Sequence, residues 1–240
     1  METTYRKEYT VLPSVCDREG LLSIADTFAA FMDVATLHAE QLGVGMRMMM
    51  QKGLFWLTVK TRVRFVRRPR LLEQVTLVTR PLAPDRLRSV REYAVEKNGE
   101  TLILGKTEWA VFETAAGKLH AIPELFTGLE LPTDPLFSEP FSRIPPDFSE
   151  ARELGRYTVR RTDVDLAGHM NNIAYLRAFL GLIPSDAWGD FPKGMLEICF
   201  RTPCFEGSTL TFRVRETETG CELAGFLPDG RCPVLIRADR

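Results

Sequence analysis

Two segments of the chain show the apolar spacing of an amphipathic helix. The first runs from about Ile24 to Leu42, where residues of one helical face are apolar. The second begins near residue 171, and either Asn171 or Asn172 would cap it, because asparagine side chains accept hydrogen bonds from free N–H groups at a helix start. The apolar stripe of this second helix consists of Ile173, Leu176, Phe179, Leu180 and Ile183.

Each predicted helix is followed by runs in which apolar and polar residues alternate, which is typical of half-buried β-strands. After the first helix the runs read LFWLTVKTRVRFV, EQVTLVTRPL and RSVREYAVEKNGETLILGKTEWAVFET, and Asn98-Gly99 marks a hairpin. After the second they read MLEICFRTP, STLTFRVRET, CELAGFLPDG and CPVLIRAD. One long helix followed by an antiparallel meander is the order of a hotdog fold. We therefore expect an α+β chain with two tandem hotdog domains, each an antiparallel sheet wrapped around a long central helix.

A proline-rich stretch separates the two halves. The segment from Pro132 to Pro146 contains five prolines, which remove backbone donors and fit neither a helix nor a central strand. We expect an N-terminal hotdog domain over residues 1–131, a Pro-rich linker over residues 132–150 and a C-terminal hotdog domain over residues 151–240.

The two halves resemble each other in sequence. When Tyr9 is placed over Tyr157, an offset of 148 residues, Asp17 falls on Asp165 and Gly20 falls on Gly168. Both segments read as a strand, an Asp-x-x-Gly turn and an amphipathic helix. This shared order indicates an internal duplication.

Composition narrows the functional classes. The net charge of -1 gives the chain no global attraction to nucleic acid or to an anionic membrane. The N-terminus is charged from its second residue, and no stretch reaches the ~18 apolar residues of a membrane span. We expect a cytoplasmic protein without membrane insertion. The five cysteines lack regular spacing and the three histidines lie far apart, so neither a disulfide framework nor a metal site is expected.

The segment over residues 160–184 carries the most specific motif, with the pattern D-x-x-x-H-x-N-N-x-x-Y. It resembles the active-site segment of plant and bacterial acyl-ACP thioesterases, and the strands of the first half look like the N-terminal domain of that family. The residues that match the motif are Asp165, His169, Asn171, Asn172 and Tyr175.

This resemblance implies hydrolysis of fatty acyl-ACP thioesters to free fatty acid and ACP, as in fatty acid biosynthesis. It implies that the N-terminal domain binds the acyl chain and that the C-terminal domain is catalytic. It also implies acyl carrier protein as the partner and no cofactor.

The chain departs from the family pattern at two catalytic positions. The Asn two residues after the motif Asp is Ala167 here, and the Glu that precedes a Cys falls on Pro203, next to Cys204. The resemblance therefore supports fold and substrate class better than the plant-type mechanism.

Thioester hydrolysis needs an activated water and a polarised carbonyl. Asp165 is the first candidate for activating water, although a turn aspartate can simply accept backbone N–H bonds. His169 could act as a general base beside it. The aligned residue of the first half is Leu21, so the fold does not require a histidine there. Gly168 and the helix start at Asn172 could polarise the carbonyl through backbone N–H groups.

Three further residues are weaker candidates. Asn171 could orient substrate or His169 if it is not the helix cap. Cys204 could act as a nucleophile, but a small buried apolar role is more common for such a residue. Glu206 is the nearest carboxylate that could replace the missing Glu, although glutamates in turns are usually solvated.

The run from Arg62 to Arg70 alternates basic and apolar residues, so one face of a strand would be cationic. Such a face could dock an acidic carrier protein, or it could simply be solvated. An acyl-CoA thioesterase and a non-catalytic acyl-binding hotdog protein are the competing functions. The sequence leaves open whether two copies form a homodimer.

Overall fold

A computed structural model describes residues 2–183 and 194–239 of the chain. It divides into two compact units, Met1–Pro140 and Phe141–Arg240, and the division falls within the predicted linker. Neither unit contains, within its described residues, a helix that is both long and apolar enough to cross a membrane.

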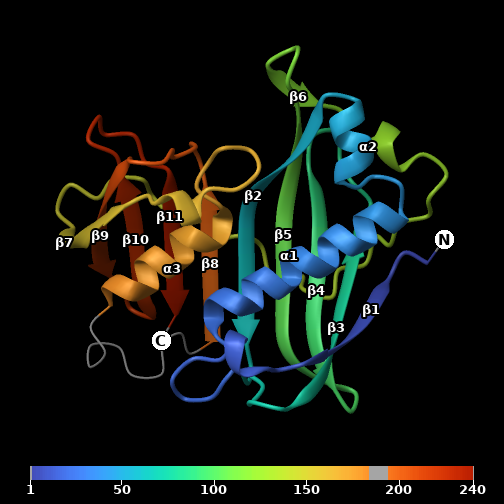
Figure 1. Cartoon of the computed structure of the whole chain (residues 1–240), viewed down its shortest axis with the longest axis horizontal. Helices are drawn as coiled ribbons and strands as arrows, with labels where there is room; N and C mark the ends of the chain where they lie inside the picture. The colour runs from blue at the N-terminus through green and yellow to red at the C-terminus, as the bar shows by residue number, and fades with distance from the viewer. Residues whose placement is uncertain (1, 184–193, 240) are drawn as a thin grey trace. The chain divides into compact units, whose positions relative to one another are not determined.

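Unit 1 is an antiparallel sheet with one long helix across it (Figure 1). Its strand order is β1-β3-β4-β5-β2, and the short strand β6 pairs with β5. The helix α1 lies over one face of this sheet, and α2 follows it. The elements are β1 (Tyr5–Thr10), a 3-10 turn (Pro13–Val15), α1 (Ile24–Gln41), α2 (Met46–Gln51), β2 (Leu54–Phe65), β3 (Gln74–Pro81), β4 (Ser89–Lys97), β5 (Glu100–Glu113), β6 (Lys118–His120) and a second 3-10 turn (Pro123–Phe126).

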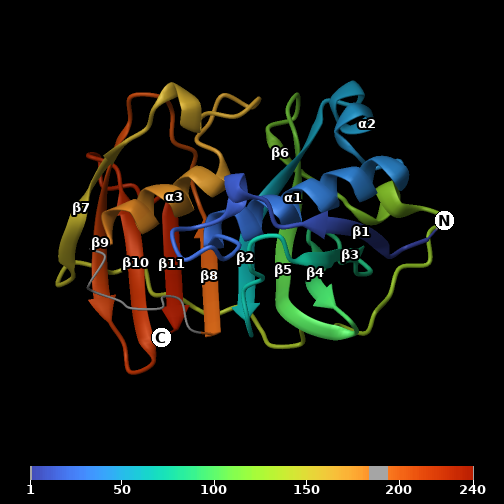
Figure 2. The ribbon, with the colours of Figure 1, turned by 60° about the horizontal axis from the view of Figure 1, so that its bottom comes forward.

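Unit 2 repeats this plan. Its strand order is β7-β9-β10-β11-β8, and α3 lies over one face of the sheet (Figure 2). Asn171, not Asn172, is the residue that caps α3. The elements are β7 (Arg152–Thr158), a 3-10 turn (Arg161–Asp163), α3 (Asn172–Leu182), β8 (Gly194–Phe200), β9 (Thr209–Glu216), β10 (Gly220–Phe226) and β11 (Val234–Asp239).

Corresponding elements of the two units occur in the same order, and several lie at the offset of 148 residues that the sequence predicts. The 3-10 turn Pro13–Val15 becomes Arg161–Asp163, and both long helices begin 148 residues apart. The isolated bridge between Cys16 and Leu22 likewise becomes the bridge between Val164 and Met170. This agreement supports the predicted duplication at the level of single hydrogen bonds.

Close packing of helix on sheet forms the core of unit 1. The Phe31 ring of α1 stacks on the Tyr93 ring of β4 with centroids 4.7 Å apart. Gly105 on β5 makes room for this ring, since a Cβ there would lie 2.5 Å from the Phe31 side chain. A larger residue would push α1 off the sheet, because protein cores leave few voids.

The proline-rich segment is anchored to unit 1 by charges that the strands present on their other face. The buried Glu92 carboxylate accepts the backbone N–H groups of Leu136 and Phe137 at 3.0 and 2.8 Å. The ammonium of Lys106, also buried, donates to the carbonyl of Phe137 at 3.1 Å. Backbone groups of a segment without regular structure are thereby satisfied.

Unit 2 holds its own part of the segment in the same way. The buried Glu197 carboxylate accepts the Ser142 N–H at 2.9 Å. Arg215 donates to the carbonyls of Asp147 and Pro145 at 2.6 and 3.1 Å, while its guanidinium pairs with Glu222. Residues 132–150 are therefore an ordered strap in which each part is fixed to its own unit.

Candidate active site

The motif turn of unit 2 is closed by its own backbone. The N–H of Asp165 donates to the carbonyl of His169 at 2.9 Å, and the N–H of Gly168 donates to the carbonyl of Asp165 at 3.0 Å. Gly168 has a φ of +76°, which favours glycine. The Asp165 carboxylate accepts the Ala167 N–H at 2.9 Å and is otherwise exposed. One carboxylate oxygen therefore shapes the turn, and the other faces solvent.

The start of α3 is fixed by Asn171. Its side-chain oxygen accepts the Ala174 N–H at 2.8 Å, and its amide nitrogen donates to the Asp163 carbonyl at 3.0 Å. Both ends of the amide are thus used in capping, so Asn171 acts by positioning the turn. Asn172 is the first residue of the helix and is half-buried.

Asp163 organises the approach to the turn, and the sequence reasoning missed it. Its carboxylate accepts the Tyr157 hydroxyl at 2.8 Å and the Arg160 N–H at 2.7 Å. Burial and this hydrogen bond raise the pKa of Tyr157. The sequence feature that could have identified Asp163 is the pair of acidic residues in Asp163-Val164-Asp165, of which the motif includes only Asp165.

The turn also contacts the segment that leads into β9. The N–H of Met170 donates to the Cys204 carbonyl at 2.8 Å. The half-buried His169 ring meets the Phe205 ring edge-on, with centroids 5.1 Å apart. These contacts place the Cys204 segment against the turn.

Cys204 is a poor nucleophile in this setting. Its side chain is fully buried, and burial raises the pKa of its thiol. The thiol interacts with the Tyr175 hydroxyl, whose pKa is also raised, mainly by burial. Because the thiolate is the reactive form, this environment favours a packing role. Glu206 is exposed in the turn between Phe205 and Ser208, where it is solvated.

The two aligned turns differ in how they use their aspartates. In unit 1 the Asp17 carboxylate accepts the N–H groups of Glu19 and Leu21 at 3.1 and 3.0 Å, and it forms an ion pair with Arg68. Arg68 precedes the residue whose carbonyl accepts the Leu22 N–H. Asp17 therefore has a structural role.

In unit 2 the residue in the place of Arg68 is Pro203, which precedes the carbonyl that accepts the Met170 N–H. Proline carries no charge to pair with Asp165. Among the described residues, the N–H of His169, the fifth residue of the turn, also makes no hydrogen bond to the Asp165 carboxylate. Asp165 and the His169 N–H are thus left available where their counterparts are not.

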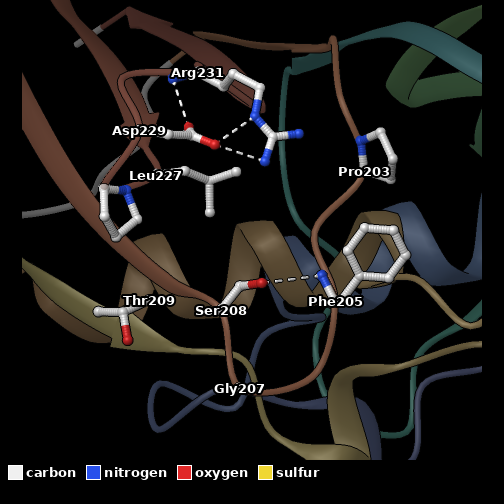
Figure 3. Close-up of a pocket in the computed structure, with 9 residues that line it drawn as sticks. Pro203, Phe205, Gly207, Ser208, Thr209, Leu227, Asp229 and Arg231 are labelled. Carbon is white, nitrogen blue, oxygen red and sulfur yellow. Dashed lines mark hydrogen bonds and ion pairs between the residues drawn. The ribbon is translucent and has the colours of Figure 1, made fainter.

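A shallow hollow of about 350 Å³ adjoins the Cys204 segment (Figure 3). Arg231 and Asp229 form an ion pair at 2.7 Å on one side of it, and the Ser208 hydroxyl accepts the Phe205 N–H at 3.3 Å on another. Neither Asp165 nor His169 lines this hollow. The lining residues are Pro203, Phe205, Gly207, Ser208, Thr209, Leu227, Pro228, Asp229 and Arg231.

The basic run of unit 1 is partly neutralised within the unit. Four of its five arginines form ion pairs there, two of them with the same carboxylate, and Arg70 is exposed. The docking of an acidic carrier on this run therefore stays a prediction from the sequence. The ion pairs join Arg62 and Arg64 to Glu139, Arg67 to Glu73, and Arg68 to Asp17.

Among the described residues, no group of three or more His, Cys, Asp or Glu side chains is placed so that it could hold a metal ion.

Sequence comparisons identify both halves of the chain. The family model of the acyl-ACP thioesterase N-terminal domain matches residues 2–128, and that of the C-terminal domain matches residues 148–227. A palmitoyl-acyl carrier protein thioesterase, chloroplastic, from Gossypium hirsutum is 24% identical over 199 residues, which cover 80% of this chain. The match covers 48% of that relative, so the chain spans about half its length.

Solved structures share the fold. An acyl-ACP thioesterase from Bacteroides thetaiotaomicron has a TM-score of 0.89 at 19% identity, with 99% of this chain and 97% of that chain covered. The 12:0-ACP thioesterase from Umbellularia californica has a TM-score of 0.81 at 18% identity, with 100% and 97% covered. These similarities confirm the predicted double hotdog fold, and the family matches over both halves show that this chain belongs to the acyl-ACP thioesterase family.

Proposed function

We propose that this protein hydrolyses fatty acyl-ACP thioesters and releases free fatty acid and ACP. The observation that carries the proposal is the difference between the two aligned turns. Unit 1 saturates Asp17 with two N–H groups and an arginine, whereas unit 2 leaves an oxygen of Asp165 exposed and places His169 four residues later. A carboxylate and an imidazole beside a helix start suit water activation.

In the proposed reaction a water held by Asp165 and His169 attacks the carbonyl carbon while His169 takes its proton. The developing oxyanion is stabilised by backbone N–H groups of the turn, among them that of His169, and by the positive end of α3. The C–S bond then breaks, and the proton passes to the leaving pantetheine thiolate. Asn171 holds the turn on the helix, and neither Ala167 nor Pro203 takes part.

We assign the acyl chain to unit 1 and the catalytic turn to unit 2, within domains at residues 1–131 and 151–240. Acyl carrier protein is the proposed partner because both halves of the chain match the acyl-ACP thioesterase family. The cytoplasmic location stays a prediction from the sequence.

The test is turnover of acyl-ACP and acyl-CoA thioesters of matched chain length by the purified protein. The proposal expects hydrolysis of acyl-ACP with the higher kcat/KM. Equal kcat/KM values for both carriers would favour the acyl-CoA alternative. Tight acyl-chain binding without hydrolysis of either thioester would leave only the acyl-binding alternative.

A further inference from the structure

Two apolar side chains flank the candidate catalytic residues of unit 2. Leu166 directly follows Asp165 in the turn and is 92% exposed, the highest exposed fraction of any large apolar residue that the structure describes. Phe205 is 51% exposed, and its ring meets the half-buried His169 ring edge-on with centroids 5.1 Å apart. We call Leu166 and Phe205 the apolar rim.

The conformation of the turn does not require an apolar residue at position 166. In the aligned turn of unit 1, Arg18 and Glu19 stand in the places of Leu166 and Ala167, and they are exposed and form an ion pair with each other. The two turns are nevertheless closed by the same pair of backbone hydrogen bonds, with lengths of 2.9 and 3.0 Å in both. The turn is therefore compatible with charged, hydrated side chains at these positions.

Phe205 differs from its counterpart in the same way. The carbonyl before Phe205 and the carbonyl before Arg70 accept N–H groups of aligned residues at 2.8 and 2.7 Å. Phe205 therefore occupies the place of Arg70, which is exposed and forms an isolated bridge with Leu21, the counterpart of His169. Both rim positions are thus charged in unit 1 and apolar in unit 2.

Single exposed apolar residues are common on protein surfaces. The apolar rim differs because one of its residues adjoins Asp165 in the chain and the other contacts the His169 ring. Apolar side chains are stabilised when apolar groups cover them, and they offer neither donors nor acceptors. The amide groups of a pantetheine arm or the charges of a carrier surface would find no partner on the rim, whereas methylene groups would.

We propose that the apolar rim holds the methylene groups of the acyl chain that directly follow the thioester carbonyl. This inference rests on the proposed function, because the carbonyl is assigned to the turn that contains Asp165 and His169. The remainder of the acyl chain stays assigned to unit 1. Methylene groups on the rim also keep bulk water away from His169, and a drier site strengthens the electrostatic contacts of the attacking water.

The first test compares acetyl-ACP with hexanoyl-ACP, which differ only in the methylene groups that follow the carbonyl. The ratio of their kcat/KM values measures the contribution of those groups, because losses that affect both substrates equally cancel. We expect Leu166→Ala and Phe205→Ala each to lower the hexanoyl-to-acetyl ratio by about 4-fold to 15-fold, as for the loss of one or two buried methylene groups. An unchanged ratio in both variants would overturn the proposal, whatever their absolute rates.

Two substitutions control for folding and for surface hydrophobicity. Leu166→Arg introduces the residue type that the aligned turn of unit 1 carries, so it should unfold at the same denaturant concentration as the wild type and still lower the ratio. Leu136→Ala shortens a leucine that is 53% exposed in the strap, and it should leave the ratio unchanged. A lower ratio in Leu136→Ala would mean that the ratio responds to surface hydrophobicity in general, which contradicts the proposal.

Other occupants of the rim give different results. Equal losses of kcat/KM with acetyl-ACP and hexanoyl-ACP would assign the rim to the pantetheine arm or to the carrier. A smaller sedimentation mass for Leu166→Arg than for the wild type, with an unchanged ratio, would assign it to a contact between two copies of the chain. Either result would overturn the proposal.

Binding of inert analogues separates this inference from the proposed function. S-ethyl-ACP and S-hexyl-ACP, whose thioether linkage cannot be hydrolysed, are titrated into wild type and Leu166→Ala by calorimetry. We expect the hexyl analogue to bind the wild type more tightly and this preference to fall in the variant. If it does and no acyl-ACP is hydrolysed, the proposed function fails while the rim remains an acyl-binding site. If acyl-ACP is hydrolysed and neither the binding preference nor the kcat/KM ratio changes in the variant, this inference fails alone.

Discussion

Removing each of the two aligned aspartates in turn should separate structure from catalysis. Asp17→Ala deletes an acceptor for two backbone N–H groups and strands Arg68, a partner that is only 17% exposed. Asp165→Ala deletes an acceptor for one backbone N–H, in an exposed turn without an arginine. The same substitution therefore tests a structural role in unit 1 and a catalytic role in unit 2.

The expected losses follow from these contacts. Hydrogen bonds to a charged group contribute about 1.5–3 kcal/mol each when buried and less when exposed. A partly exposed ion pair adds at most about 1 kcal/mol. We expect Asp17→Ala to lower the free energy of unfolding by about 3 kcal/mol, against about 1 kcal/mol for Asp165→Ala.

Both quantities can be measured on the same preparations. Denaturant unfolding gives the stability, and hydrolysis of an acyl-ACP under conditions where both variants are folded gives the turnover. We expect Asp17→Ala to keep near wild-type kcat and Asp165→Ala to lose most of it. The reasoning is refuted if Asp165→Ala is the less stable variant and retains its turnover.

Four other variants test single contacts. Asn171→Ala should lower the free energy of unfolding by about 1 kcal/mol through loss of the helix cap, measured by denaturant unfolding. Glu92→Ala should lower it by about 3–5 kcal/mol, because the half-buried Arg80 loses its ion-pair partner and the buried Lys106 lies nearby. Glu96→Ala on the same strand should lower it by less than about 1 kcal/mol, and similar losses in the two variants would show that Glu92 does not anchor the strap. Cys204→Ala should retain most turnover, and an acyl-enzyme trapped on the wild type would disprove this. Hydrogen bonds from Arg67, the Arg70 N–H and Lys97 hold the pKa of Glu73 well below its usual range. The stability that the Glu73 carboxylate contributes is therefore present above about pH 4.3 and is lost as the pH falls. Denaturant unfolding of Glu73→Gln and wild type across pH should show that the difference between their free energies of unfolding shrinks in acid.

Local signals in the sequence were enough to predict most elements of the fold. The first helix begins at Ile24 as expected, because Ser23 accepts the Asp26 N–H at 3.0 Å. The hairpin at Asn98-Gly99 forms with φ angles of 50° and 83°, which few other residue pairs adopt readily. Such features depend on neighbouring residues alone, so a single sequence reveals them.

Contacts between residues far apart in the sequence could not be predicted from local sequence patterns. Glu92 and Lys106 alternate with apolar neighbours and look solvated, yet the strap more than thirty residues away in sequence covers them. The arginines between Arg62 and Arg70 similarly find carboxylates whose positions no periodicity encodes. At the candidate site, the motif predicted the position of the turn. Only the hydrogen bonds in the structure show that Asn171, and not Asn172, caps the helix.

The most direct measurement of the central claim is single-turnover hydrolysis of an acyl-ACP by wild type, Asp165→Asn and His169→Ala. Glu218→Gln, on an exposed turn of the same unit, serves as the control. We expect each site variant to lower the rate about 10²-fold or more, as loss of a water-activating group does, while the control is unchanged. Near wild-type rates in both site variants, with correct folding, would show that the turn of unit 2 is not the catalytic centre.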